Sequence, residues 1–317
     1  ALNTAILGLA RKNARKGKHI VTTAVEHDAV LASCQVLEEE GWEVSYLKTD
    51  RYGAVTPAAV AEAVRDDTVL VAVMQVNNEL GTINPVSEIA GAAKAKKEDV
   101  FVVVDGVQAF GKMAVDLTGI DAYAISAHKL HGPKGIGALV VKDEVQPRMK
   151  PLVVGGGQER GLRSGTQNVP GIVGLGTAAE LAYRDLSRNR KHIQTLAEHF
   201  SVRFSTMEEV VVNSPDPLTS SGQVIGLETT LNVSFLGVSA EALLHTLEEQ
   251  GIYVSTGSAC STNNKIKSHV LEHITDRQEV KDSAIRFGLS RLNTEEEIQK
   301  AGSAVKEAVE ELRKLAL

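Results

Sequence analysis

The chain has 317 residues, of which 43% are hydrophobic and 23% charged, values typical of a soluble globular protein with two domains. Its 34 Lys and Arg are outnumbered by 40 Asp and Glu, for a net charge of −6, so no surface for nucleic acids or anionic membranes is predicted. No apolar run is long enough to cross a bilayer, no secretory signal opens the chain, and two distant cysteines indicate no disulfide framework. A cytoplasmic location is therefore predicted.

Short β-rich runs alternate with amphipathic helical segments in the first half of the chain. Strands are predicted at 19–23, 42–47, 68–75, 100–104, 122–126 and 137–141, and helices at 1–10, 29–40, 57–65 and 86–97. The runs 68–75 and 100–104 are apolar throughout, as is typical of parallel strands that are covered on both faces. This alternation predicts right-handed crossovers and a mostly parallel sheet.

The second half has a different pattern. Helices are predicted at 166–186, 191–204, 240–250 and 294–315, and strands at 229–235 and 284–289. The sequence therefore predicts an α/β protein with two domains. A large domain over residues 1–186 would contain the mostly parallel sheet flanked by helices, and a smaller α+β domain would occupy residues 187–317.

Polar side chains follow three successive strands of the predicted large domain. Asn78 follows one strand, Asp105 the next, and Ser126, His128 and Lys129 the one after. In an open α/β sheet, ligands bind beyond the carboxyl ends of the strands. Each residue alone has a structural explanation as a cap, a turn or a solvated side chain. The ordered set on successive strand ends indicates a binding site.

This set resembles the aminotransferase class V group of fold-type I enzymes, which use pyridoxal 5′-phosphate (PLP). The resemblance implies that Lys129 forms the Schiff base with PLP and that Asp105 pairs with the pyridine nitrogen. Lys134, in the same loop, is a second candidate for the cofactor lysine. The remaining implied contacts are Gln108 and Asn78 at the ring hydroxyl, Ser126 and His128 at the phosphate, and His27 stacked over the ring. Asn78 would also contact the substrate carboxylate. Gly106 departs from the group's pattern and is expected to leave the site intact.

The two cysteines lie in contrasting sequences. Cys34 falls in the apolar pattern of a helix and is predicted to be part of the core. Cys260 lies among Gly, Ser, Thr and Asn, where a thiol is accessible and able to form a thiolate. The segment 255–264 resembles the cysteine-bearing loop of the NifS/IscS-type cysteine desulfurases, which implies that Cys260 receives sulfur. No resident metal is implied, although Cys260 could act as a transient iron–sulfur ligand.

Two further segments carry the resemblance. Residues 155–166 resemble a desulfurase segment that crosses to the partner subunit, so that Thr166 would contact the partner's cofactor phosphate in a homodimer. Residues 284–291 resemble the strand whose arginine binds the substrate α-carboxylate. Arg286 is the first candidate because a guanidinium pairs with a carboxylate bidentately, and Arg291 is the second.

The resemblance covers essentially the whole chain and implies conversion of L-cysteine to L-alanine, with a persulfide on Cys260. Lys129 and His27 would move protons, and an iron–sulfur scaffold or a tRNA-thiolation protein would accept the sulfur. Selenocysteine lyase, another class V aminotransferase, or an inactive scaffold for sulfur-transfer partners are the alternatives. Family members carry a further N-terminal segment before the point that matches Ala1, so we expect this chain to be truncated, cleaved or incomplete.

Overall fold

The computed structural model describes residues 1–216, 224–256 and 268–315, which divide into two compact units. Unit 1 comprises Ala1–Thr49, Val55–Asn77 and Asn84–Leu186. Unit 2 comprises Asp50–Ala54, Asn78–Ile83 and Ser187–Leu317. Two short segments from the first half of the chain thus belong to unit 2, which a boundary drawn along the sequence does not anticipate.

Unit 1 is built on a six-stranded sheet with the order β2-β1-β3-β4-β5-β6. The strands are β1 (His19–Thr23), β2 (Glu43–Leu47), β3 (Thr68–Met74), β4 (Phe101–Asp105), β5 (Ala122–Ser126) and β6 (Gly137–Val141). All neighbouring strands are parallel except β6, which is antiparallel to β5. The prediction of a mostly parallel sheet is confirmed.

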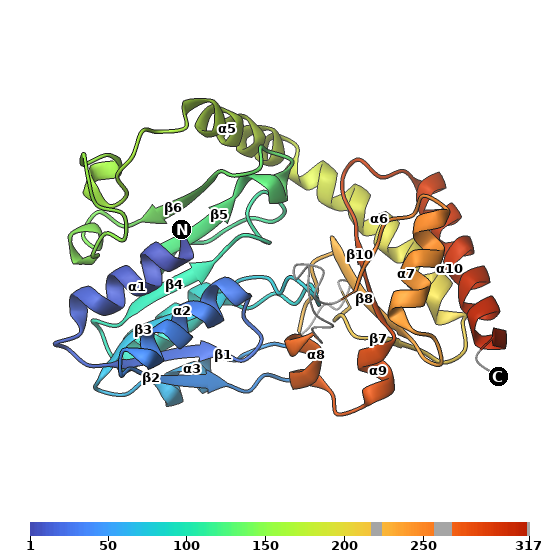
Figure 1. The fold of residues 1–317 in the computed structure, drawn as a ribbon, viewed down its shortest axis with the longest axis horizontal. Helices are drawn as coiled ribbons and strands as arrows, with labels where there is room; N and C mark the ends of the chain where they lie inside the picture. The colour runs from blue at the N-terminus through green and yellow to red at the C-terminus, as the bar shows by residue number, and fades with distance from the viewer. Residues whose placement is uncertain (217–223, 257–267, 316–317) are drawn as a thin grey trace. The chain divides into compact units, whose positions relative to one another are not determined.

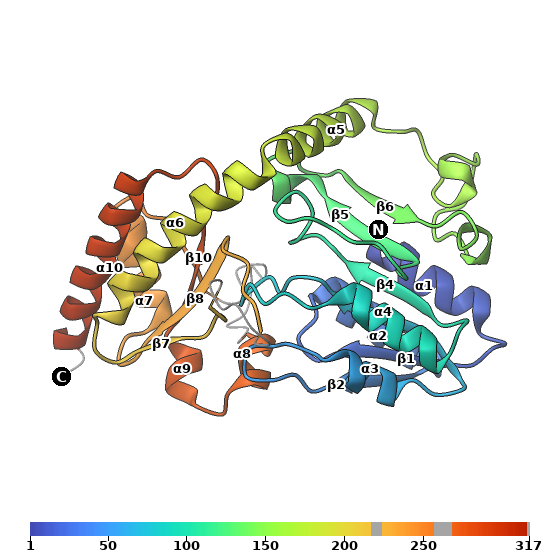
Figure 2. The ribbon, with the colours of Figure 1, turned by 180° about the vertical axis from the view of Figure 1, so that it is seen from behind.

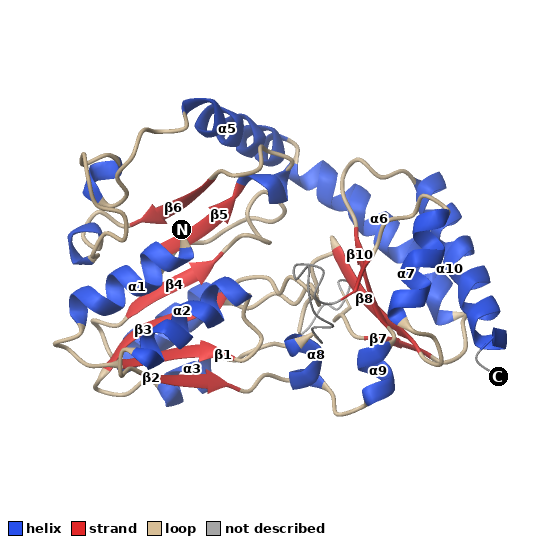
Figure 3. Cartoon of the chain, in the orientation of Figure 1, coloured by secondary structure: helices blue, strands red, loops and turns tan. Residues whose placement is uncertain are grey.

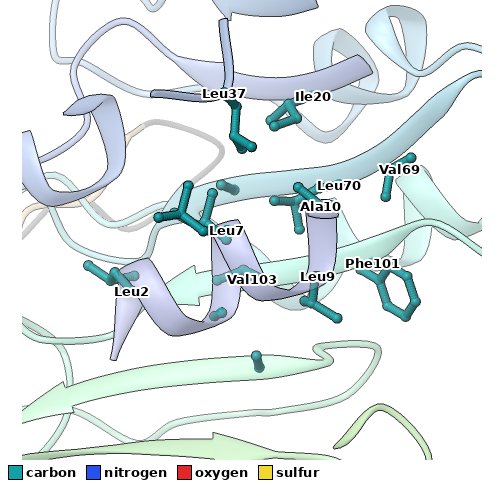
Figure 4. Packing of buried hydrophobic residues seen from close by; sticks show 14 of the residues in the cluster. Leu2, Leu7, Leu9, Ala10, Ile20, Leu37, Val69, Leu70, Phe101 and Val103 are labelled. Atoms are coloured by element: carbon teal, nitrogen blue, oxygen red, sulfur yellow. The ribbon is translucent and has the colours of Figure 1, made fainter. Parts of the chain in front are cut away.

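Helices cover both faces of this sheet. Helices α1 (Leu2–Asn13) and α2 (Asp28–Glu39) lie over one face, and α3 (Pro57–Ala63) and α4 (Val86–Lys96) over the other (Figures 1 and 2). The sequence of β3 is apolar throughout because successive side chains of a strand point to opposite faces of the sheet, and both faces are covered here. Leu70 (Figure 4) and Ala72 join the core beneath α1 and α2, whereas Val71 and Val73 join the core of α3 and α4.

The parallel strands bring the residues after their carboxyl ends to one edge of the sheet. Four loops that follow β1, β3, β4 and β5 lie at this edge, and the last contains the short helix η1 (Ala127–Leu130). The rest of unit 1 contains η2 (Gln146–Arg148), η3 (Glu159–Gly161) and α5 (Val169–Arg184). Within the described ranges, no helix has both the length and the apolar character needed to cross a membrane.

Unit 2 contains an antiparallel sheet with the order β7-β8-β10-β9 (Figure 3). Its elements are α6 (Leu186–Ser205), β7 (Val210–Val212), β8 (Thr230–Phe235), α7 (Ala240–Glu249), β9 (Ser255–Thr256), α8 (His269–Ile274), α9 (Gln278–Asp282), β10 (Ala284–Gly288) and α10 (Glu295–Leu315). The core forms where α6, α7 and α10 pack on the sheet, with Phe200, Phe204 and Phe287 in mutual ring contact. The sequence did not predict β7, β9, α8 or α9, which are too short to show a periodic pattern.

Candidate functional site

A buried carboxylate and an exposed amine lie at the carboxyl ends of two neighbouring strands of the unit 1 sheet. Asp105 is the last residue of β4 and is only 6% exposed. Lys129 is exposed and lies in η1, directly after β5, and the two strands pair in parallel. Burial raises the pKa of Asp105, while a hydrogen bond from the Val107 N–H (3.0 Å to Oδ1) and electrostatic interactions with His27 and Lys129 oppose this. The carboxylate, the imidazole and the amine are therefore close enough for their charges to interact.

His27 is held by the start of helix α2. Its ring is exposed, and its Nδ1 accepts a hydrogen bond of 3.1 Å from the backbone N–H of Ala29, so His27 is the N-cap residue. Because Nδ1 is an acceptor in this bond, the neutral ring carries its proton on Nε2. The cap thus sets the ring's orientation and leaves the Nε2–H as a hydrogen-bond donor.

The other predicted cofactor contacts of unit 1 are polar groups of the same loops. Ser126 Oγ lies 2.8 Å from Nδ1 of His128. Burial and the charges of Lys129 and Lys134 lower the pKa of His128, which favours a neutral ring. Gln108 is partly exposed, and its Oε1 accepts a hydrogen bond of 2.7 Å from Lys112.

Gly106 is required by the packing around Asp105, a role that the sequence analysis did not recognise. A Cβ atom at Gly106 would lie 1.9 Å from Cζ of Tyr123, so the Tyr123 ring occupies the place of a side chain. The Tyr123 hydroxyl donates a buried hydrogen bond of 2.6 Å to Oε1 of Gln75. No local sequence signal connects these residues, because Tyr123 lies on β5 and Gly106 follows β4.

Glu26 was also missed. It precedes His27 and is completely buried, and Thr23 Oγ1 donates a hydrogen bond of 2.8 Å to its Oε1. Burial, opposed by hydrogen bonds from Thr23 and the backbone of Met74, raises its pKa to about 8. A charged residue directly before a candidate site histidine was the available signal.

Unit 2 brings together two residues that the sequence analysis assigned to the substrate carboxylate. Arg286 lies on β10 and its Nη1 donates a hydrogen bond of 3.1 Å to the backbone oxygen of Asn78, 208 positions away in the chain. Oδ1 of Asn78 is buried and has no hydrogen-bond partner in the described part of the chain. Arg291, the second candidate, follows the end of β10 and is partly exposed.

Cys260 lies outside the described residues, but unit 2 contains the residues on both sides of the segment 257–267. On one side, Ser255 of β9 pairs with Arg286 of β10. On the other side, Ser268 caps helix α8 and donates a hydrogen bond of 2.5 Å from Oγ to Oε2 of Glu79, the residue after Asn78. The described residues on the two sides of this segment therefore contact Arg286 and the neighbour of Asn78.

The other two predicted residues differ in exposure. Cys34 is completely buried in the core beneath α1 and α2, and burial above all raises the pKa of its thiol to about 12. Such a thiol stays protonated at neutral pH, which agrees with its predicted structural role. Thr166 is exposed in the segment that precedes α5.

Known proteins match this chain over nearly its whole length. The family model for aminotransferase class V matches residues 1–301. Cysteine desulfurase IscS of Methanosarcina thermophila is 40% identical, and that of Azotobacter vinelandii 42%, each over 99% of this chain and 76% of the relative. Among solved structures, a NifS-like protein is 36% identical with a TM-score of 0.89, over 98% of this chain and 80% of that one. DndA from Streptomyces lividans is 35% identical with a TM-score of 0.77, over 91% and 80%.

The chain belongs to the aminotransferase class V family, whose fold-type I enzymes depend on PLP. Within that family it is of the NifS/IscS type, as its similarity to the cysteine desulfurases shows. The residues of unit 1 fit the cofactor, because they offer an amine for its aldehyde, a buried carboxylate for its ring nitrogen and an imidazole for its ring face.

Proposed function

We propose that this protein is a PLP-dependent cysteine desulfurase, which converts L-cysteine to L-alanine and collects the sulfur as a persulfide on Cys260. The observation that carries the proposal is the placement of three groups in unit 1: the buried Asp105 at the end of β4, the exposed Lys129 directly after the neighbouring strand β5, and His27 at the N-cap of α2. The similarity to cysteine desulfurases over 99% of the chain supports the choice of substrate. In this proposal unit 1 binds the cofactor and unit 2 carries Arg286 and the cysteine segment.

Each residue of unit 1 has a defined task in this reaction. PLP, when bound, supplies an electron sink for negative charge at the substrate α-carbon. Asp105 holds the ring nitrogen, and burial strengthens this charge-assisted hydrogen bond. Lys129 binds the cofactor aldehyde and, after the substrate has displaced it, moves the α-proton. His27 would be the acid/base residue near the substrate thiol, and while Nδ1 accepts the cap hydrogen bond its Nε2–H can donate a hydrogen bond to the substrate sulfur.

Unit 2 would hold the substrate and take its sulfur. Arg286 pairs with the α-carboxylate, and the amide of Asn78 provides a second polar contact. The Cys260 thiolate then attacks the substrate sulfur, so that a sulfur–sulfur bond forms and the carbon–sulfur bond breaks. The electron pair of the broken bond remains with the carbon, which is protonated to give L-alanine.

The test is the absorption spectrum of the purified protein with added PLP. A visible band that borohydride reduction removes, with the cofactor found by mass spectrometry on the Lys129 peptide, is the expected result. A protein that stays colourless at saturating PLP would contradict the proposal and favour the scaffold alternative. Cofactor on Lys134 instead would contradict the assignment of the lysine.

Comparison of Cys260→Ala with wild-type protein on two substrates separates the desulfurase from a selenocysteine lyase. A desulfurase should lose alanine formation from cysteine when Cys260 is replaced, since the sulfur then has no acceptor. A lyase that releases selenium should continue to act on selenocysteine. Equal activity of both proteins on cysteine would contradict the role of Cys260.

We also propose that the protein acts as a cytoplasmic homodimer and passes sulfur to an iron–sulfur scaffold or a tRNA-thiolation protein. Helix α5 supports a dimer, because it exposes Val169, Ile172 and Val173 close to Thr166 in sequence. Analytical ultracentrifugation should detect a dimer, and Ile172→Glu together with Val173→Glu should shift it toward monomer. Unchanged sedimentation would contradict this interface.

A further inference from the structure

The turn between β1 and α2 contains a buried carboxyl group beside the cofactor residues. Glu26 is 0% exposed, although the next residue, His27, is exposed. Its Oε1 accepts a hydrogen bond of 2.8 Å from Oγ1 of Thr23, the last residue of β1. The preceding carbonyl, that of Val25, accepts a hydrogen bond of 3.1 Å from Asn77, which follows β3. Side chains from two strand ends therefore hold the turn that presents His27.

We propose that Glu26 is a positioning residue for the cofactor site, where as a neutral carboxylic acid it fixes the His27 turn and leaves Asp105 as the negative charge for the ring nitrogen. The proposal rests on the cofactor roles proposed for His27 and Asp105. Glu26 itself lies in the interior, so it contacts neither substrate nor cofactor directly.

The surroundings of Glu26 favour the neutral form. Among the described residues, Asp105 of β4 and Cys34 of α2 interact electrostatically with Glu26. Cys34 remains a neutral thiol, since burial raises its pKa to about 12. The negative charge of Asp105 adds to the effect of burial, and the pKa of Glu26 is raised to about 8. Two ionised carboxylates in this low-dielectric region would repel each other, so a proton on Glu26 favours charge on Asp105.

The first experiment measures the protonation of Glu26 without cofactor. A carboxyl group with a higher pKa in the folded than in the unfolded chain destabilises the fold as pH rises between the two values, here from 4.5 to about 8. In this window the folding constant should fall by up to about tenfold per pH unit, as urea unfolding of the apoprotein would measure. Glu26→Gln should remove most of this dependence, because glutamine stays neutral.

Glu39→Gln is the matched control, because Glu39 is exposed on α2 and should keep the wild-type profile. Identical pH profiles for wild-type protein and Glu26→Gln would show an ionised Glu26 and overturn the proposal. This measurement needs no cofactor, so its result is independent of whether the protein binds PLP.

The second experiment measures the dissociation constant for PLP and the pH dependence of the bound cofactor's absorption. Glu26→Gln preserves a neutral acceptor for Thr23 and should leave both close to wild type. Glu26→Leu should weaken PLP binding about fivefold to tenfold, the equivalent of one lost hydrogen bond. If Glu26→Leu does not fold, Thr23→Val removes the same hydrogen bond and should have the same effect. If Glu26→Gln, Glu26→Leu and Thr23→Val all bind PLP with equal affinity, then Glu26 contributes only to packing and the proposal is overturned.

Discussion

The two units position their chemical groups in different ways. In unit 1, Asp105, Lys129 and His27 lie at the ends of parallel strands or in the loops that follow those strands. The sheet that positions them is buried on both faces. In unit 2, Arg286 lies within a strand of an antiparallel sheet and contacts the backbone of Asn78. Changes in unit 1 should therefore impair cofactor binding, whereas changes in unit 2 should impair substrate use and leave the cofactor in place.

The largest effect is expected at Lys129. Lys129→Ala removes both the amine that binds the cofactor and the group that moves the α-proton, so alanine formation should fall by about 10³-fold or more. Steady-state kinetics at saturating PLP would measure this. Lys134→Ala is the control in the same loop and should retain activity and the visible band. If Lys134→Ala instead loses the activity and the visible band, then Lys134 is the lysine that binds the cofactor.

A smaller loss is expected for Gly106→Ala, which tests how strongly the sheet edge holds Asp105. The added methyl group overlaps the Tyr123 ring, so the free energy of unfolding should fall by about 1–3 kcal/mol and PLP affinity should fall with it. Urea unfolding and absorption titration would measure the two effects. Gly91→Ala, on an exposed position of α4 with open space around it, is the matched control and should be neutral or slightly stabilising. Equal behaviour of the two variants would show that Gly106 is dispensable.

The contrast between the units is tested directly by Arg286→Lys. Lysine keeps the charge but loses the planar pair of donors, so the KM for cysteine should rise about tenfold or more while the cofactor spectrum stays unchanged. Arg291→Lys serves as the comparison and should have little effect. A rise in KM for Arg291→Lys alone would show that Arg291, and not Arg286, binds the substrate carboxylate. Loss of the cofactor band in Arg286→Lys would show that unit 2 also contributes to cofactor binding.

The smallest effect on activity is expected for Cys34→Ala. Cys34 is buried with a thiol pKa of about 12, so alkylation by iodoacetamide should be at least about a hundredfold slower than at a thiolate-forming cysteine. Mass spectrometry of the native protein should find Cys260 modified first and Cys34 only after unfolding. Persulfide formation should survive Cys34→Ala. Rapid native labelling of Cys34 would contradict its place in the core.

Much of the fold was predictable because local pattern and tertiary role agree. The predicted strand 19–23 coincides with β1, and the apolar run at 68–75 is β3 with both faces covered. Asp105 and Lys129 could be placed at one edge from sequence, since parallel strands bring their carboxyl ends together. The strands β7 and β9 could not be predicted because they have only three and two residues, and the helices α8 and α9 because six and five residues complete fewer than two turns.

The amino-acid sequence by itself determined the α/β class, the strand ends that carry polar residues, and the contrast between a core cysteine and one in a polar segment. These properties depend on residue type and spacing within a few positions. Only the tertiary structure decided that Tyr123 takes the space beside Gly106, that Arg286 contacts Asn78, and that Glu26 is buried near Asp105. These contacts join residues of different strands and loops, and their spacing along the chain says nothing about the distance between them in the fold.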